Sequence, residues 1–215
     1  FTAFSGSHQD AIKKGMKKVD RDRWEVPYLP IDPADVGSSY KETVRVNSQS
    51  GKGGIGFVLE EFYGIALPKS ILVQFSQVVQ KLTEQLDREV KPSEILEALL
   101  AEYVDETGLY QLVDYDLSSG ISADQRCIAR VKVADNLVVI DGEGTGPIDA
   151  FINGMVETLN EPLNVCDYHE NAMTSGKDAQ AMCVVSIGDE REACIGIGLS
   201  RNTITASLKA IVSAL

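Results

Sequence analysis

The chain has 215 residues, enough for one large domain or two smaller ones. Its formal net charge of -12 and its 44% of hydrophobic residues are typical of an acidic globular protein. An acidic chain repels the phosphate backbone of nucleic acids, so we expect no nucleic-acid partner. The sequence contains neither an apolar run approaching the roughly 18 residues that cross a bilayer nor a secretory signal. We therefore expect a cytoplasmic protein that does not interact with a membrane.

The first predicted helix covers residues 8–19 and carries a histidine in its first turn. Ser7 is the predicted N-cap, and Asp10 follows three residues later, close to a capping box. The positive end of a helix disfavours imidazolium, so His8 is expected to be neutral near pH 7. A neutral imidazole at this position can act as a general base or as a hydrogen-bond donor. The alternative is an ordinary surface histidine on a capped helix.

The next segment, Val26-Pro-Tyr28-Leu-Pro-Ile-Asp-Pro33, holds three prolines in eight residues. Proline removes a backbone donor and fixes φ, which excludes a helix interior or a central strand. We expect the segment to be pinned in an extended form over a surface, with the ring of Tyr28 aimed by the rigid backbone.

Residues 51–107 are predicted to be mostly helical, because hydrophobic residues recur at helical spacing. Pro92 is well placed as the first residue of a second helix, which Gly108 would end. The first apolar stripe comprises Ile71, Leu72, Phe75, Val78, Val79, Leu82 and Leu86, and the second comprises Ile95, Leu96, Leu99, Leu100 and Tyr103.

Residues 108–215 contain an internal repeat. Leu112-Val-Asp-Tyr115 matches Val165-Cys-Asp-Tyr168, and Gly142-Glu-Gly144 matches Gly196-Ile-Gly198. Each copy indicates three strands followed by a helix that begins after the glycine turn. The predicted strands include residues 126–133 and 137–140 in the first copy, and 181–187 and 193–197 in the second. The fold class is therefore α+β, with two antiparallel sheets backed by two helices.

Such sheets need their open faces and edges covered, and homodimerisation is a natural solution. The glycine turns also bring backbone N–H groups close to helix N-termini, which favours a bound carboxylate. We predict a small-molecule carboxylate site near residues 144–146, with an amino acid as the ligand. The alternative is that these glycines only shape a tight turn.

The four cysteines, which show no CxxC spacing, lie in apolar, strand-like surroundings. Buried free thiols in a reducing cytoplasm are therefore expected, rather than zinc ligands or disulfides. They are Cys127, Cys166, Cys183 and Cys194.

Three segments together resemble the 2-isopropylmalate synthase family. They are Ser5-Gly-Ser-His8-Gln-Asp-Ala-Ile12, the proline-rich segment 26–33, and Arg45-Val-Asn-Ser-Gln-Ser-Gly-Lys-Gly-Gly54. The repeat resembles the regulatory domain of that family, with 142–147, 167–168 and 171–173 as landmarks. The resemblance extends over the whole chain. It implies a linker subdomain over 1–50, a helical linker subdomain over 51–107 and a regulatory domain over 108–215.

The resemblance also implies an activity for the full-length enzyme, an acyltransferase of leucine biosynthesis. Such an enzyme condenses acetyl-CoA with 3-methyl-2-oxobutanoate and hydrolyses the thioester to 2-isopropylmalate and CoA. A divalent metal in a (β/α)₈ barrel polarises the oxo acid. The barrel would precede Phe1, so we expect no metal ligand in this chain and no catalysis by the chain alone. We expect a homodimer that leucine inhibits.

Family resemblance assigns His8 and Tyr28 to the active site of the partner subunit, where His8 would assist proton transfer. It assigns a leucine pocket to ten residues: Gly144, Thr145, Gly146, Ile148, Asp149, Val165, Tyr168, Ala172, Ala179 and Ala181. Asp149 departs from the small apolar residue usual in the family. Its carboxylate could pair with the leucine ammonium, or it could narrow or close the pocket.

Two alternatives remain open. The chain could be a stand-alone amino-acid-binding sensor. It could instead be the equivalent part of a citramalate or homocitrate synthase, with isoleucine or lysine as effector. The VPYLPIDP and NSQSGKGG segments favour the isopropylmalate family.

Overall fold

The computed structural model describes residues 6–16, 18–19, 23–37, 51–104, 108–119, 124–160, 162–173, 179–188 and 193–215. The chain divides into two compact units, Phe1–Leu99 and Leu100–Leu215, each of which is described by itself. The part of the third family-like segment that covers residues 45–50 lies outside the described residues. No helix in the described ranges is long and apolar enough to cross a membrane.

The first unit begins with helix α1 (Gly6–Met16) and a short 3-10 helix, η1 (Pro33–Val36). The first helix starts before the predicted N-cap, so Ser7 lies inside its first turn. Ile12 of α1 forms a small buried core with Val26 and Leu29. Segment 26–33 is therefore not extended throughout as predicted: residues 26–29 make a turn, and the residues at its two ends, Val26 and Leu29, both pack with Ile12.

Three further helices follow, α3 (Lys52–Tyr63), α4 (Lys69–Leu86) and α5 (Pro92–Tyr103). The predicted stripe of α4 is confirmed at Ile71, Phe75 and Val79, which are buried, but Leu86 at its end is exposed. Pro92 does begin α5, but the helix ends at Tyr103, before the predicted end at Gly108.

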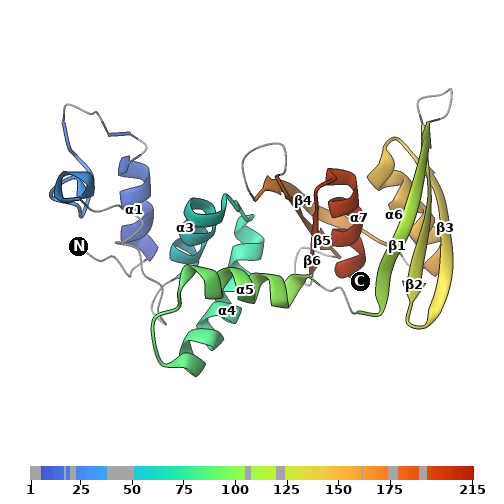
Figure 1. Cartoon of the computed structure of the whole chain (residues 1–215), viewed down its shortest axis with the longest axis horizontal. Helices are drawn as coiled ribbons and strands as arrows, with labels where there is room; N and C mark the ends of the chain where they lie inside the picture. Colours follow the sequence, from blue (N-terminus) through green and yellow to red (C-terminus); the bar gives the residue numbers. More distant parts are fainter. Residues whose placement is uncertain are drawn as a thin grey trace. The chain divides into compact units, whose positions relative to one another are not determined.

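The second unit contains two sheets and two long helices (Figure 1). The first sheet has the strand order β1 (Tyr110–Ser119), β2 (Gln125–Val133) and β3 (Asn136–Gly144), and α6 (Pro147–Leu159) follows it. The second has the order β4 (Val165–Ala172), β5 (Ala181–Ile187) and β6 (Cys194–Ser200), and α7 (Thr203–Ser213) follows it. All neighbouring strands are antiparallel, so the predicted α+β class and the βββα repeat are confirmed.

The register of the strands corrects one detail of the predicted repeat. Cys127 on β2 lies opposite Gly142 on β3, and Cys183 on β5 lies opposite Gly198 on β6. A Cβ added to Gly142 would lie 2.2 Å from a backbone oxygen of α6, and one added to Gly198 would lie 2.0 Å from a backbone oxygen of α7. Gly142 is thus equivalent to Gly198, and the predicted match of Gly142 with Gly196 is wrong by two residues.

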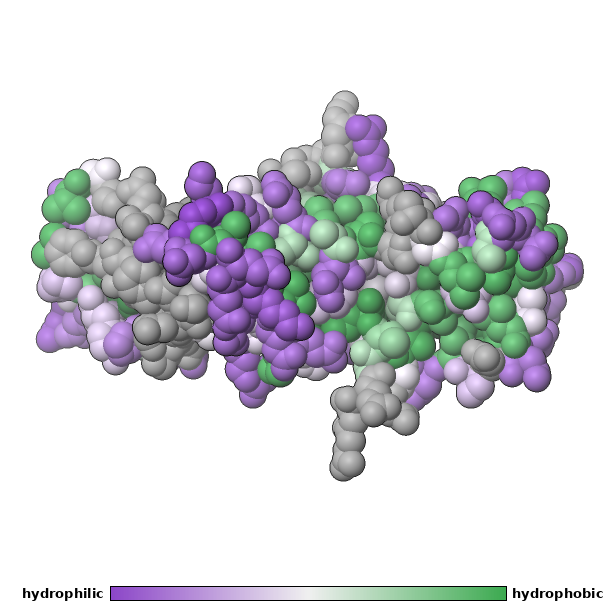
Figure 2. Space-filling model, turned by 90° about the horizontal axis from the view of Figure 1, so that it is seen from below, coloured by the Kyte–Doolittle hydropathy of each residue, from purple (hydrophilic) through white to green (hydrophobic). Residues whose placement is uncertain are grey.

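The two sheets share one buried core but differ in their outer faces. On β2, exposed Arg126, Ile128 and Arg130 alternate with buried residues, whereas every residue from 182 to 187 of β5 is buried. Hydrophobic residues also reach the surface over the second unit, in the right half of Figure 2. The first sheet therefore has one face packed on α6 and one face open.

The four cysteines are free, as predicted, but only two are buried. Cys127 and Cys183 point into the shared core, and burial raises the pKa of the Cys127 thiol to about 11. Cys166 and Cys194 are exposed, so the prediction that all four are buried is wrong. Both exposed cysteines lie at strand ends, where an apolar sequence neighbourhood does not ensure coverage.

Candidate functional site

The rings of His8 and Tyr28 lie side by side. His8 is in the first turn of α1, and Tyr28 is in the turn formed by segment 26–29. Their rings stack with centroids 4.2 Å apart and planes inclined by 28°. Both side chains are exposed, with 62% of the Tyr28 surface open to solvent. The first unit thus presents an imidazole and a phenol together at its surface, where both can reach a group outside the unit.

The backbone of Tyr28 explains why its ring points toward His8. The N–H of Leu29 donates to the carbonyl of Val26 at 3.2 Å, which closes a turn with Pro27 and Tyr28 at its centre. Tyr28 has φ +66°, in the left-handed region that costs a residue with a side chain about 1–2 kcal/mol. Proline followed by positive φ is the type II turn pattern, in which glycine is the usual second residue.

Two tertiary contacts hold this strained turn in place. The indole N–H of Trp24 donates to the carbonyl of Leu29 at 2.7 Å. A Cβ on Gly15 would lie 2.7 Å from Cδ of Pro27, so α1 approaches the turn as closely as a glycine allows. Because α1 also carries His8, the same packing fixes both members of the ring pair. Neither contact is visible in the local sequence pattern.

The predicted leucine-binding residues fall into two groups, and the first is the turn between β3 and α6. Gly144 ends β3, and Gly146 is the N-cap of α6 without a side-chain capping bond. Oδ2 of Asp149 accepts the Thr145 N–H at 2.9 Å and the Thr145 hydroxyl at 3.2 Å. The glycine turn was predicted to offer its backbone N–H groups to the carboxylate of a ligand. The carboxylate of Asp149 accepts one of them, the Thr145 N–H, instead.

The second group lies on β4 and β5. Val165 begins β4, Ala172 ends it opposite Ala181 of β5, and Ala179 precedes β5. The hydroxyl of Tyr168 donates to Oε1 of Glu170 at 2.5 Å and shares a hydrogen bond of 2.7 Å with Oγ of Ser207 on α7. Burial is the main cause that raises the pKa of Tyr168, and the hydrogen bond to the Glu170 carboxylate raises it further. The Tyr168 hydroxyl therefore stays protonated and can donate a hydrogen bond.

The structure brings part of the two groups together. Ile148 of the first group and Val165, Tyr168 and Ala181 of the second all border the same buried core. Asp149, in contrast, is exposed. Four of the ten residues thus border one core, whereas Ala172, like Asp149, is exposed.

Sequence reasoning missed the residues that fix these side chains. Ser207 is fully buried and hydrogen-bonded to Tyr168, and its only signal was a hydroxyl within the apolar stripe of α7. The tyrosine at the matching position of the first repeat, Tyr115, shares a 2.8 Å hydrogen bond with Thr205 of the same helix. Both repeat-related tyrosines therefore bond to α7, which the repeat alone does not predict.

No group of three or more His, Cys, Asp and Glu side chains is placed to hold a metal ion within the part of the chain that the structure describes. The described residues therefore offer no donor set for the divalent metal that the family resemblance implies.

Comparisons with known families match most of the chain. Residues 1–60 match the family described as alpha-isopropylmalate synthase, post-catalytic domain-like. Residues 89–215 match the LeuA allosteric (dimerisation) domain.

Curated relatives named 2-isopropylmalate synthase align with the chain over its full length. The protein of Mesorhizobium japonicum is 42% identical over 220 residues, which cover 100% of this chain and 39% of the relative. That of Cupriavidus taiwanensis is 43% identical over 216 residues, covering 99% of this chain and 37% of the relative. The protein of Brucella suis is 41% identical over 220 residues, covering 100% and 40%. The chain thus spans about two fifths of the length of these relatives.

The domain match agrees with the duplicated βββα fold, and the post-catalytic match covers the segment that carries the stacked His8 and Tyr28. The chain therefore belongs to the 2-isopropylmalate synthase family and contains the LeuA allosteric (dimerisation) domain of that family.

Proposed function

We propose that the chain carries the feedback control of a 2-isopropylmalate synthase. In this proposal the whole enzyme condenses acetyl-CoA with 3-methyl-2-oxobutanoate in the cytoplasm. The observation that carries it is the match of residues 89–215 to an allosteric domain, on a fold with two βββα units. The catalytic barrel and its divalent metal would lie outside this chain. The division at residues 50 and 107 stays a prediction.

The proposed effector is leucine, bound between the turn after β3 and the start of β4. Support comes from Ile148, Val165 and Ala181, which border one core, and from Tyr168, whose hydroxyl is hydrogen-bonded to Glu170 and Ser207. Both bonds from Thr145 to Asp149 end on Oδ2. We propose that Oδ1 of Asp149 accepts from the leucine ammonium, while the isobutyl group packs on Ile148 and Val165.

This assignment is tested by leucine inhibition of CoA release in the full-length enzyme. Asp149→Asn keeps the acceptor for Thr145 but removes the charge, and it should raise the leucine concentration for half-inhibition about tenfold. Asp135→Asn, at an exposed aspartate in the turn between β2 and β3, is the matched control and should leave inhibition unchanged. Tighter inhibition of Asp149→Asn would show that the carboxylate obstructs leucine instead.

We propose that His8 moves a proton in the reaction and that Tyr28 holds the His8 ring in place. Support comes from the stacked geometry at the surface and from the strained turn, since backbone strain concentrates at functional sites. Replacing His8 by Ala in the full-length enzyme should lower kcat by a factor of about 10² to 10⁴. His169→Ala is the control, because His169 is the chain's other histidine and pairs with Asp167 on β4. If the two variants have the same kcat, His8 does not take part in the reaction.

We propose that the domain forms a homodimer that covers the open face of the first sheet. That face carries exposed Ile128, Leu137 and Val139, and the matched family is described as a dimerisation domain. Sedimentation equilibrium should give twice the chain mass, and Val139→Lys should shift the equilibrium toward the monomer. A control at the exposed Val36 of the first unit, Val36→Lys, should not. A dimer that Val139→Lys leaves intact would place the contact elsewhere.

A further inference from the structure

Helix α7 is hydrogen-bonded to both repeats through its first two turns. The hydroxyl of Thr205 shares a 2.8 Å hydrogen bond with the hydroxyl of Tyr115 on β1. Oγ of Ser207 shares a 2.7 Å hydrogen bond with the hydroxyl of Tyr168 on β4. Because Tyr168 is one of the residues of the proposed leucine pocket, α7 is in contact with that pocket through Ser207.

The hydroxyls of Tyr168 and Ser207 have more partners than protons. The Tyr168 hydroxyl contacts Oε1 of Glu170 and Oγ of Ser207. Oγ of Ser207 also lies 2.8 Å from the carbonyl oxygen of Thr203 and 3.5 Å from Oε1 of Glu170. Each hydroxyl has one proton, so the two hydroxyls can donate to only two of these four contacts at one time. A ligand that bonds to the Tyr168 hydroxyl therefore redistributes both protons among the remaining contacts.

The contact between Ser207 and Thr203 connects this network to the shape of α7. Ser207 is fully buried, so its hydroxyl donates to one of these protein acceptors and not to bulk water. A serine that donates to the carbonyl four residues before it often bends its helix. The bend of α7 therefore depends on the acceptor to which Ser207 donates.

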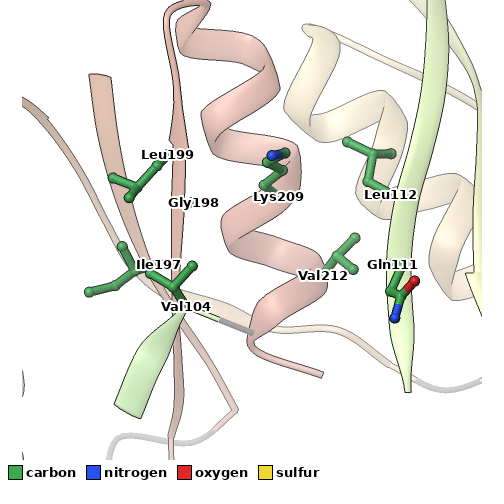
Figure 3. Close-up of a pocket in the computed structure, with 8 residues that line it drawn as sticks. All are labelled: Val104, Gln111, Leu112, Ile197, Gly198, Leu199, Lys209 and Val212. Atoms are coloured by element: carbon green, nitrogen blue, oxygen red, sulfur yellow. The ribbon is translucent and has the colours of Figure 1, made fainter. Parts of the chain in front are cut away.

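The last turn of α7 is bonded to the end of α5. Oγ of Ser213 donates to the carbonyl of Tyr103, the last residue of α5, at 2.8 Å. The final carbonyls of a helix lack partners within that helix, and this bond satisfies one of them. The next residue, Val104, lines the same hollow as Val212 of α7 (Figure 3). Helix α5 begins in the first unit and ends in the second.

We infer that α7 couples the effector pocket to the rest of the enzyme. This inference rests on the leucine control proposed above. Leucine that bonds to Tyr168 sets the acceptor of the Ser207 hydroxyl and, with it, the bend of α7. Ser213 transmits that bend to α5, through which the chain leads back to the unit that carries His8 and Tyr28. Ser213 is thus a positioning residue for inhibition and does not itself bind leucine.

The test compares Ser213→Ala with the wild type. In the full-length enzyme, the activity that remains at saturating leucine should rise about two- to tenfold, the effect of one neutral hydrogen bond. The rate without leucine should be unchanged, and so should the affinity of the 215-residue chain for leucine in isothermal titration. Ser213→Thr keeps the hydroxyl and should be inhibited like the wild type. Ser76→Ala on α4 is the matched control, because the Ser76 hydroxyl also donates to a backbone carbonyl, that of Val73.

Hydrogen exchange of the wild-type 215-residue chain gives a second measurement, which needs no variant. The N–H of Val104 donates to the carbonyl of Leu100 at 2.9 Å, at the end of α5. Leucine should slow the exchange of this N–H, because the bound ligand holds α7 in the shape that bonds to α5. The N–H of Asp87, which donates to the carbonyl of Thr83 at the end of α4, is the control and should exchange at an unchanged rate.

Two results would overturn the inference and leave the proposed leucine control intact. One is inhibition of Ser213→Ala equal to that of the wild type, which together with a lowered melting temperature would show that Ser213 only stabilises the fold. The other is unchanged exchange of the Val104 N–H when leucine binds. Absence of leucine inhibition in the wild-type enzyme would instead overturn the proposed function, and this inference with it.

Discussion

The strained turn at Tyr28 gives a prediction whose sign is set by backbone conformation alone. Both Tyr28→Ala and Tyr28→Gly remove the ring that stacks on His8, so the loss of stacking cancels between the two variants. A left-handed φ costs alanine about 1–2 kcal/mol, and glycine escapes this cost. Glycine loses more conformational entropy on folding than alanine does, and this offsets about 0.5–1 kcal/mol of its advantage. Tyr28→Gly should therefore be more stable than Tyr28→Ala by about 0.5–1 kcal/mol.

Urea unfolding followed by tryptophan fluorescence measures this difference directly. Trp24 is the chain's single tryptophan, and its indole bonds to the same turn through Leu29. A helical position provides the reversed control: at the exposed Lys81 of α4, alanine should be more stable than glycine by about 1 kcal/mol. If Tyr28→Ala equals or exceeds Tyr28→Gly in stability, the backbone at this turn is not left-handed and the argument for stored strain fails.

Three further predictions concern the fold. Gly198→Ala should lower the free energy of unfolding by about 1–3 kcal/mol or more, because the added methyl group meets the α7 backbone. Gly51→Ala is the control and should lower the free energy of unfolding far less, because a Cβ there meets nothing within 4 Å. The Arg88 hydrogen bond lowers the pKa of Glu94 from 4.5 to about 2, so its stabilisation is complete above pH 4.5 and is lost as the pH falls toward 2. Acid unfolding of wild type and Glu94→Gln should therefore differ above pH 4.5 and converge near pH 2. Iodoacetamide at pH 8 should alkylate two of the four cysteines in the native chain, Cys166 and Cys194.

The repeat shows where sequence reasoning succeeded and where it could not. The sequence predicted β2 and β5 to within one residue, β2 because buried and exposed residues alternate along it and β5 because it is a continuous apolar run. The glycine match was wrong by two residues for a physical reason. Side chains of a strand alternate with a period of two, so a shift of two residues keeps every side chain on its face and leaves the pattern unchanged. Strand pairing fixes the register, since Gly142 lies opposite Cys127 and Gly198 lies opposite Cys183.

The candidate sites show a similar division. Flanking prolines predicted that Tyr28 would be aimed by its backbone, but the left-handed turn depends on Trp24 and Gly15, which are close only after folding. The family resemblance identified Asp149 as unusual, yet its bonds to Thr145 follow from the geometry of the turn.

The central claim, that this chain carries the leucine control of its enzyme, is tested most directly by calorimetric titration of the 215-residue chain with leucine, isoleucine and lysine. The account predicts saturable binding of leucine, weaker binding of isoleucine and none of lysine, with leucine affinity reduced in Asp149→Asn. Absence of heat with leucine, or tighter binding of isoleucine or lysine, would contradict it.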